Sequence, residues 1–130
     1  MDSPDFAVRH RWAGPVRVVR PVGDLDADTA ERAAPEVRAA LDRARCVVLD
    51  LSSVTFLDCR AAGVLLALAL EARERGGRLR VAALPPCAHR VFGLFGLYPV
   101  LGGRSDVAGE CRAALDDLVD TPHAWVRASA

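Results

Sequence analysis

Residues that could take part in chemistry are few in this chain of 130 residues, and their spacing keeps them apart. The three histidines, His10, His89 and His123, fall in a predicted strand, a predicted helix and the C-terminal segment, so we expect no shared site. Asp24 and Asp26 form a pair of carboxylates, but they lie in a predicted turn, where such side chains usually accept hydrogen bonds from backbone amides. This pattern does not predict acid–base catalysis.

The cysteines do not form a recognisable metal site. They stand at positions 46, 59, 87 and 111, with no Cys-x-x-Cys pair and no histidine at ligand spacing, which argues against zinc. Cys46 and Cys111 lie among apolar residues, where an inert buried thiol is expected. Cys59 differs from them, because it lies at the predicted start of a helix beside Arg60.

Sequence motifs of nucleotide-binding and hydrolytic enzymes are absent. The chain has no Gly-x-Gly-x-x-Gly after a strand and no Gly-x-Ser-x-Gly. It also contains no lysine, which excludes the phosphate-binding lysine of a P-loop. We therefore expect no enzymatic activity, no catalytic residue, no metal and no cofactor.

Charge and hydropathy indicate a cytoplasmic protein. The 17 basic residues balance 17 acidic residues, so no excess of positive charge favours binding to nucleic acid. The apolar run at 64–70 is far shorter than the roughly 20 residues that span a bilayer, so direct membrane insertion is not expected. The N-terminal residues lack the basic segment and the apolar stretch of a secretory signal.

The first half of the chain predicts a hairpin followed by a helix. Residues 6–12 and 16–22 read as strands joined by a turn at Ala13-Gly14-Pro15, and residues 23–26 break the pattern. Asp28 is a candidate N-cap for the next helix, with Glu31 in capping-box position. Pro35 opposes an uninterrupted helix, so either a short first turn precedes it or the main helix begins at that proline, and the second is the favoured prediction.

The second half predicts alternating helices and strands. Residues 46–51 are almost entirely apolar, which is typical of a central strand that is buried on both faces. This alternation predicts a single α/β domain with a mixed, mostly parallel sheet of four to five strands and helices packed against it. The remaining elements are predicted as a loop at 52–58, a helix at 60–75, a strand at 79–84, a helix from Pro86 to Phe95, a weak strand near 100–101, a helix at 106–119 and a loose tail at 120–130. The helix at 60–75 is expected to bury Val64, Leu65, Leu68, Ala69 and Ala72, and the helix at 86–95 a stripe of Ala88, Val91, Phe92 and Phe95.

One segment carries a family resemblance. Residues 55–66 read Thr-Phe-Leu-Asp-Cys-Arg-Ala-Ala-Gly-Val-Leu-Leu, which resembles the pattern Phe-Ile-Asp-Ser-Ser-Gly-Leu-Gly-Val-Leu-Leu at the centre of the STAS domain of anti-sigma-factor antagonists. The resemblance covers about residues 8–118. Four further segments resemble the family in order and spacing: 23–26, 48–52, 76–79 and 86–97.

The resemblance implies a regulatory protein that binds a histidine-kinase-like anti-sigma factor or a related protein kinase in partner switching. In such systems the kinase phosphorylates the first serine of the motif, and the added charge releases the partner. The implied partner-binding surface surrounds the start of the second long helix. In this sequence it comprises Asp24, Asp26, Asp58, Cys59, Arg60 and Ala62.

The chain departs from the family pattern at this motif. Cys59 stands at the position of the phosphorylated serine and Arg60 at the position of the second serine, so serine phosphorylation there is excluded. Cys59 is either a redox switch or a small residue that fills a serine-sized space. Arg60 either adapts the surface to an acidic contact or is a tolerated substitution. The nearest hydroxyls, at positions 52, 53 and 55, precede the helix by several residues.

Two alternative functions were weighed, one implied by the same resemblance and one suggested by Cys59. STAS domains also serve as protein-binding subunits of membrane transport systems, and the missing serine is compatible with that role. An enzyme with Cys59 as nucleophile is disfavoured, because no base stands at an evident spacing. The sequence does not define the oligomeric state.

Overall fold

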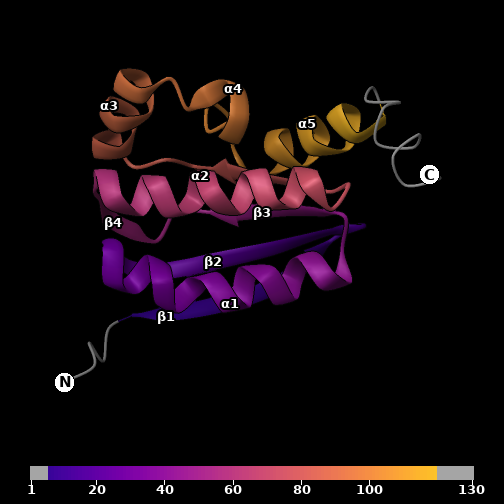
Figure 1. Ribbon diagram of the computed structural model, residues 1–130, viewed down its shortest axis with the longest axis horizontal. Helices are drawn as coiled ribbons and strands as arrows, with labels where there is room; N and C mark the ends of the chain where they lie inside the picture. The colour runs from indigo at the N-terminus through magenta and orange to yellow at the C-terminus, as the bar shows by residue number, and fades with distance from the viewer. Residues whose placement is uncertain (1–5, 120–130) are drawn as a thin grey trace.

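The computed structural model describes residues 6–119, which form strands and helices in the order β-β-α-β-β-α-β-α-α-α (Figure 1). The expected tail at 120–130, with His123, lies outside these residues. The elements are β1 (Ala7–Ala13), β2 (Val16–Leu25), α1 (Ala27–Arg43), β3 (Cys46–Asp50), β4 (Val54–Leu57), α2 (Cys59–Glu74), β5 (Arg78–Ala82), α3 (Pro86–Phe95), α4 (Tyr98–Leu101) and α5 (Val107–Val119).

The strands form one mixed sheet in the order β1-β2-β3-β5, with β4 paired to the far end of β2. Only the β1–β2 hairpin is antiparallel, and the β2–β3, β2–β4 and β3–β5 pairs are parallel. Strand β3 lies inside the sheet and all five of its residues are buried. These features confirm the predicted fold class and the central position of the apolar strand.

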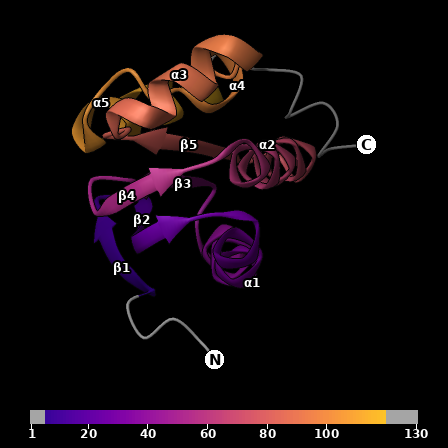
Figure 2. The same ribbon diagram turned by 90° about the vertical axis from the view of Figure 1, so that its left-hand side faces the viewer.

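Helices cover both faces of the sheet (Figure 2). On one face, α1 and α2 pack over the larger apolar cluster, which includes Val19, Leu49 and Leu68. On the other face, α5 packs over a smaller cluster that includes Val48 and Cys111. The alternation of buried side chains along β3 therefore supplies both layers of the core.

The segment between β3 and α2 contains a strand where the sequence predicted a loop. Strand β4 is short and pairs in parallel with the last residues of β2, with Leu25 opposite Leu57. Strand β2 also continues through the predicted break, because Gly23 adopts a positive φ of 114° and the register shifts there without ending the ladder. Glycine tolerates this conformation at little cost.

Helix α1 begins earlier than predicted. Asp26, rather than Asp28, is the N-cap, and Pro35 lies inside the helix rather than at its start. A proline inside a helix costs about 3 kcal/mol, because it removes one hydrogen bond and its ring crowds the preceding turn. Pro35 is exposed, and the opposite face of the helix buries six side chains that hold the two halves together: Thr29, Ala30, Ala33, Ala34, Val37 and Ala40.

Two expectations for the C-terminal third were wrong. The weak strand near 100–101 is the short helix α4, because the amides of Leu101 and Gly102 bond to carbonyls four residues back, and only Gly102 bridges to a strand. Phe95 was expected in the core stripe of α3 but is 57% exposed. Only Ala88 and Phe92 of α3 are buried.

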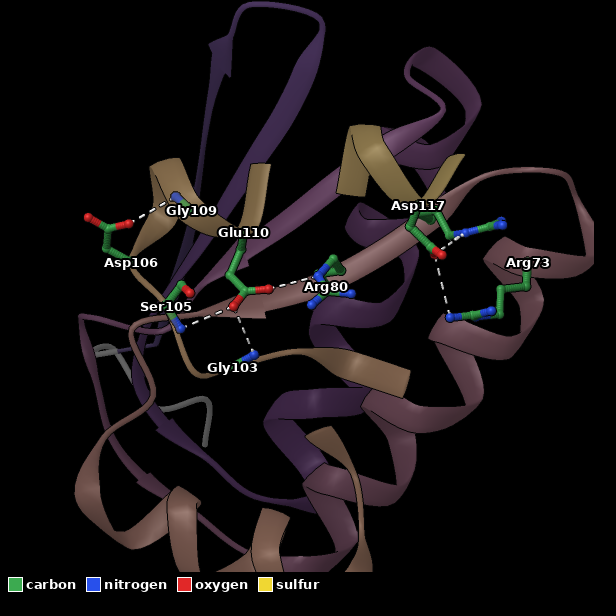
Figure 3. Close-up of polar contacts among 9 residues, drawn as sticks. Arg73, Arg80, Gly103, Ser105, Asp106, Gly109, Glu110 and Asp117 are labelled. Atoms are coloured by element: carbon green, nitrogen blue, oxygen red, sulfur yellow. Dashed lines mark hydrogen bonds and ion pairs between the residues drawn. The ribbon is translucent and has the colours of Figure 1, made fainter. Parts of the chain in front are cut away.

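Helix α5 is attached to β5 through a buried carboxylate (Figure 3). Glu110 is 2% exposed and accepts a hydrogen bond from Arg80 Nε at 2.7 Å. The same carboxylate accepts from the backbone amides of Gly103 at 3.2 Å and Ser105 at 3.1 Å. One side chain thus ties the helix, the strand and the loop before the helix together. Near the other end of α5, Asp117 pairs with Arg73 and Arg78.

Candidate functional site

One arrangement of residues occurs twice at the same end of the sheet. Strand β2 ends on Leu25 and Asp26 caps α1, while β4 ends on Leu57 and Asp58 caps α2. The two leucines are paired in the parallel β2–β4 ladder, and the Asp58 amide donates to the Leu25 carbonyl at 3.3 Å. This register places the starts of α1 and α2 side by side.

The aspartates at this end are held by local hydrogen bonds. Asp26 Oδ1 accepts from the Thr29 amide at 2.9 Å, and the Thr29 hydroxyl in turn accepts from the Asp26 amide. Asp58 Oδ1 accepts from the amide of Ala61 at 2.9 Å. Asp24 accepts from the hydroxyl of Thr55 at 2.5 Å. Asp26 and Asp58 therefore cap the two helix starts through backbone amides, whereas Asp24 lies in β2 and links it to β4 through a side-chain hydroxyl, not through the backbone amide that was expected.

Hydrogen bonding lowers the pKa of Asp26 below its ordinary value. The main cause is the Thr29 amide, which donates to the charged carboxylate. A carboxyl with a lower pKa in the folded state stabilises the fold above its unfolded pKa of about 3.9, and this contribution is lost as the pH falls through the folded pKa.

We expect the Asp26→Asn variant to be less sensitive to acid than the wild type. Asparagine also caps helices but does not titrate, so the free energy of unfolding of the wild type should fall more steeply below about pH 4. Urea unfolding of both proteins from neutral to acidic pH measures this difference. Parallel pH profiles would contradict the assignment of Asp26 as a titrating cap.

Cys59, Arg60 and Ala62 follow the Asp58 cap in the first turn of α2. The side chains of Cys59 and Arg60 are exposed. Ala62 is 2% exposed and belongs to the apolar core, which corrects the expectation that every residue of the predicted surface is accessible. Ala62 shares the buried face of α2 with Leu65 and Ala69, which follow it at the three- and four-residue spacing of one helix face.

Two open grooves meet at Cys59 and Arg60. One groove of about 490 Å³ lies between the two helix starts and is lined mostly by charged residues, namely Asp26, Ala27, Asp28, Asp58, Cys59 and Arg60. A mostly apolar groove of about 370 Å³ runs between α2 and the end of α3 and is lined by Cys59, Arg60, Ala62, Gly63, Leu66, Phe95 and Leu97. We call the second one the α2–α3 groove.

The other residues considered as chemically active do not join this site. His10 bonds to Glu36 at 2.9 Å and His89 bonds to Tyr98 at 2.7 Å, each at the surface. Cys46 and Cys111 are buried, and burial raises the pKa of both thiols, as expected for inert cysteines. Within residues 6–119, no cluster of acidic, histidine or cysteine side chains could hold a metal ion. No helix there is long and apolar enough to cross a membrane.

Comparison with known families identifies the fold. Residues 8–102 match the family described as "Mlab, STAS domain". The chain belongs to the STAS domain family. The predicted resemblance is thereby confirmed over most of the chain.

Similar proteins carry regulatory names. The anti-sigma F factor antagonist of Paenibacillus polymyxa is 30% identical over 88 residues, which are 66% of this chain and 75% of the relative. The crystal structure of an anti-sigma factor antagonist from Mycobacterium paratuberculosis has a TM-score of 0.74 and 24% identity, covering 88% of this chain and 98% of the other. The structure of the Bacillus cell fate determinant SpoIIAA in its phosphorylated form has a TM-score of 0.63 and 20% identity, and the match covers 82% of this chain and 99% of the other.

In this STAS domain, the structure brings together all six predicted site residues at the start of α2 or beside it. The groove between the helix starts adds Asp28, which the sequence suggested only as a cap. The α2–α3 groove adds Gly63, Leu66, Phe95 and Leu97, which sequence reasoning missed. The apolar residues at the end of α3, before Gly96, are a sequence signal for the α3 side of this groove. The same apolar stripe is equally typical of a helix face buried in the core.

Proposed function

We propose that this STAS domain is an anti-sigma-factor antagonist that acts by binding a histidine-kinase-like anti-sigma factor and does not catalyse a reaction. Membership of the STAS family and the names of its relatives support this function. The observation that carries the proposal is the pairing of the two helix starts, which presents Cys59 and Arg60 on one accessible surface. We further propose that residues 8–118 act as a single binding domain.

The binding surface that we propose comprises Asp24, Asp26, Asp58, Cys59 and Arg60, with Ala62 buried directly beneath it. We call it the helix-start surface. Asp26 and Asp58 cap helices and Asp24 bonds to the hydroxyl of Thr55, so replacing these aspartates would disturb the shape of the surface as well as its charge. Cys59 is the better position to test, because its exposed side chain forms no part of the core.

Regulation at Cys59 differs from the serine phosphorylation that the family pattern implies. A thiol stands where the pattern has its phosphorylated serine, so we propose that binding is not switched by serine phosphorylation at this position. Two of the nearest hydroxyls are already engaged, since Ser53 accepts from Arg20 at 3.0 Å and Thr55 donates to Asp24. Because both hydroxyls also lie before α2 begins, we propose that neither takes over the role of the missing serine.

A charge at position 59 should weaken binding. We expect Cys59→Asp to bind the anti-sigma factor at least tenfold more weakly, a loss of about 1.4 kcal/mol, because the new carboxylate lies beside Asp58 and must lose water in the interface. An aspartate in the first turn of a helix is compatible with the helix dipole, so the variant should fold normally. Calorimetry against each purified histidine-kinase-like anti-sigma factor of the source genome measures the affinity.

Two variants control for this test. Cys59→Ser keeps the size of the side chain and should keep the affinity. Cys87→Asp places the same charge on another exposed cysteine in a first helical turn, that of α3, outside both grooves, and should also keep the affinity. Equal affinity of Cys59→Asp and wild type would show that the partner docks elsewhere. A chain that binds no anti-sigma factor but co-purifies with subunits of a membrane transport system would overturn the proposed function.

A further inference from the structure

The α2–α3 groove is an apolar surface beside the helix-start surface. In Figure 1, α3 lies next to the end of α2 that begins with Cys59. Apart from Arg60 and the thiol of Cys59, the residues that line this groove are apolar or glycine. Phe95 forms one wall and is 57% exposed, more than Trp12 at 49% or Phe56 at 47%.

The packing of α2 and α3 leaves this groove open. Gly63 faces solvent, and a Cβ atom placed on it would meet no atom within 4 Å. Helix α3 buries only Ala88 and Phe92, so its last turn, with Leu94 and Phe95, is not drawn into the core. An apolar groove between two helices can receive the apolar face of a third helix.

Arg60 supplies the only charge among the residues that line the groove. Its exposed side chain forms none of the ion pairs found among residues 6–119. A cation in the first turn of a helix also opposes the helix dipole, so the stability of α2 does not account for it. A carboxylate on a docked partner would complete the pair.

We propose that the α2–α3 groove receives an amphipathic helix of the anti-sigma factor, with apolar side chains packed against Leu66 and Phe95 and a carboxylate paired with Arg60. This inference rests on the proposed function and specifies the partner's side of the contact. It also assigns the apolar centre of the interface to Gly63, Leu66, Phe95 and Leu97, beyond the helix-start surface. Fully desolvated apolar anchors of this kind usually carry most of the binding energy.

Filling the groove tests the apolar part. Gly63→Leu places a side chain in the open space on α2, and it should not destabilise the helix because leucine is a better helix former than glycine. We expect its affinity for the anti-sigma factor that binds the wild type to fall at least tenfold. Gly93→Leu is the matched control, since Gly93 is also exposed and helical with no atom within 4 Å of a Cβ, but does not line the groove. Its affinity should stay within twofold of the wild type.

Changing the charge tests the polar part. Arg60→Glu should lose at least tenfold in affinity and Arg60→Gln less, and the loss should shrink at high salt because the pair is screened. Hydrogen exchange of the complex should show protection of residues 59–66 and 95–97 and of one helical segment in the partner. Melting curves check that each variant is folded.

The outcomes separate this inference from the proposed function. If an anti-sigma factor binds the wild type and Gly63→Leu equally well, the groove is not part of the interface, although the proposed function stands. If Arg60→Glu binds as well as the wild type, the partner has no carboxylate paired with Arg60, and the proposed ion pair is wrong. If Gly63→Leu instead converts a dimer of this chain to a monomer in sedimentation, the occupant is a second copy and the inference is wrong.

Discussion

Replacing Glu110 by alanine is expected to lower the free energy of unfolding by about 3–5 kcal/mol, the range observed when one partner of a buried ion pair is removed. The carboxylate is 2% exposed and bonds to Arg80 Nε and to the amides of Gly103 and Ser105 (Figure 3). Its loss leaves a largely buried guanidinium without a counter-charge and removes the acceptor of two backbone amides. Urea unfolding followed by circular dichroism measures the change.

Two further variants separate charge from hydrogen bonding at this position. Glu110→Gln keeps an oxygen that can accept from the amides of Gly103 and Ser105 but loses the charge, so its cost should be smaller than that of alanine. The double replacement of Arg80 and Glu110 by methionine removes both charges and should recover part of the stability that the alanine variant loses. A loss of less than about 1 kcal/mol for Glu110→Ala would show that the pair contributes no more than an exposed one.

Replacing Phe92 by alanine is expected to cost about 3–5 kcal/mol, the usual cost of truncating a buried phenylalanine. Phe92 is fully buried and makes an edge contact with Tyr98 at 5.6 Å between ring centroids. Together with Ala88 it provides the whole buried face of α3. We therefore expect α3 to detach locally before the domain unfolds, which amide exchange of residues 86–95 would detect.

Phe95→Ala is the matched control for this prediction. It removes the same side chain three residues later in the same helix, but Phe95 is more than half exposed, so stability should change by about 0.5 kcal/mol or less. The two variants should also differ in how they affect partner binding. Phe92→Ala should weaken binding by releasing α3, whereas Phe95→Ala should weaken it with an intact fold. Equal stability of both variants would contradict the assignment of Phe92 as the anchor of α3.

The sequence by itself predicted the elements that local patterning specifies. The uninterrupted apolar run of β3 predicted a central strand, and the spacing of Leu65, Leu68 and Ala72 predicted one buried face of α2. Residues 55–66 predicted the STAS family, and Asp58 followed by Cys59 and Arg60 marked the start of α2 as the candidate site. These signals are local, because each depends on residues within one or two turns of a helix or one strand.

Other elements depend on partners that are distant in the sequence. Strand β4 has four residues, too few for a clear alternation, and it forms because β2 offers it a free edge. Pro35 stays inside α1 because the buried face on both sides of it outweighs the local cost. The sequence pattern contains neither the edge of β2 nor the surface against which α1 packs.

For the candidate site, the sequence determines the residue types and the tertiary structure determines which of them are neighbours. The residue types at positions 58–60 are in the sequence, but the parallel register of β2 and β4 alone brings Asp26 beside Asp58. The α2–α3 groove joins residues about 30 positions apart, so its existence depends on how α3 docks through Phe92. Side chains that meet only through packing leave no periodic signal along the chain, and for this reason the tertiary structure decided where the apolar half of the surface lies.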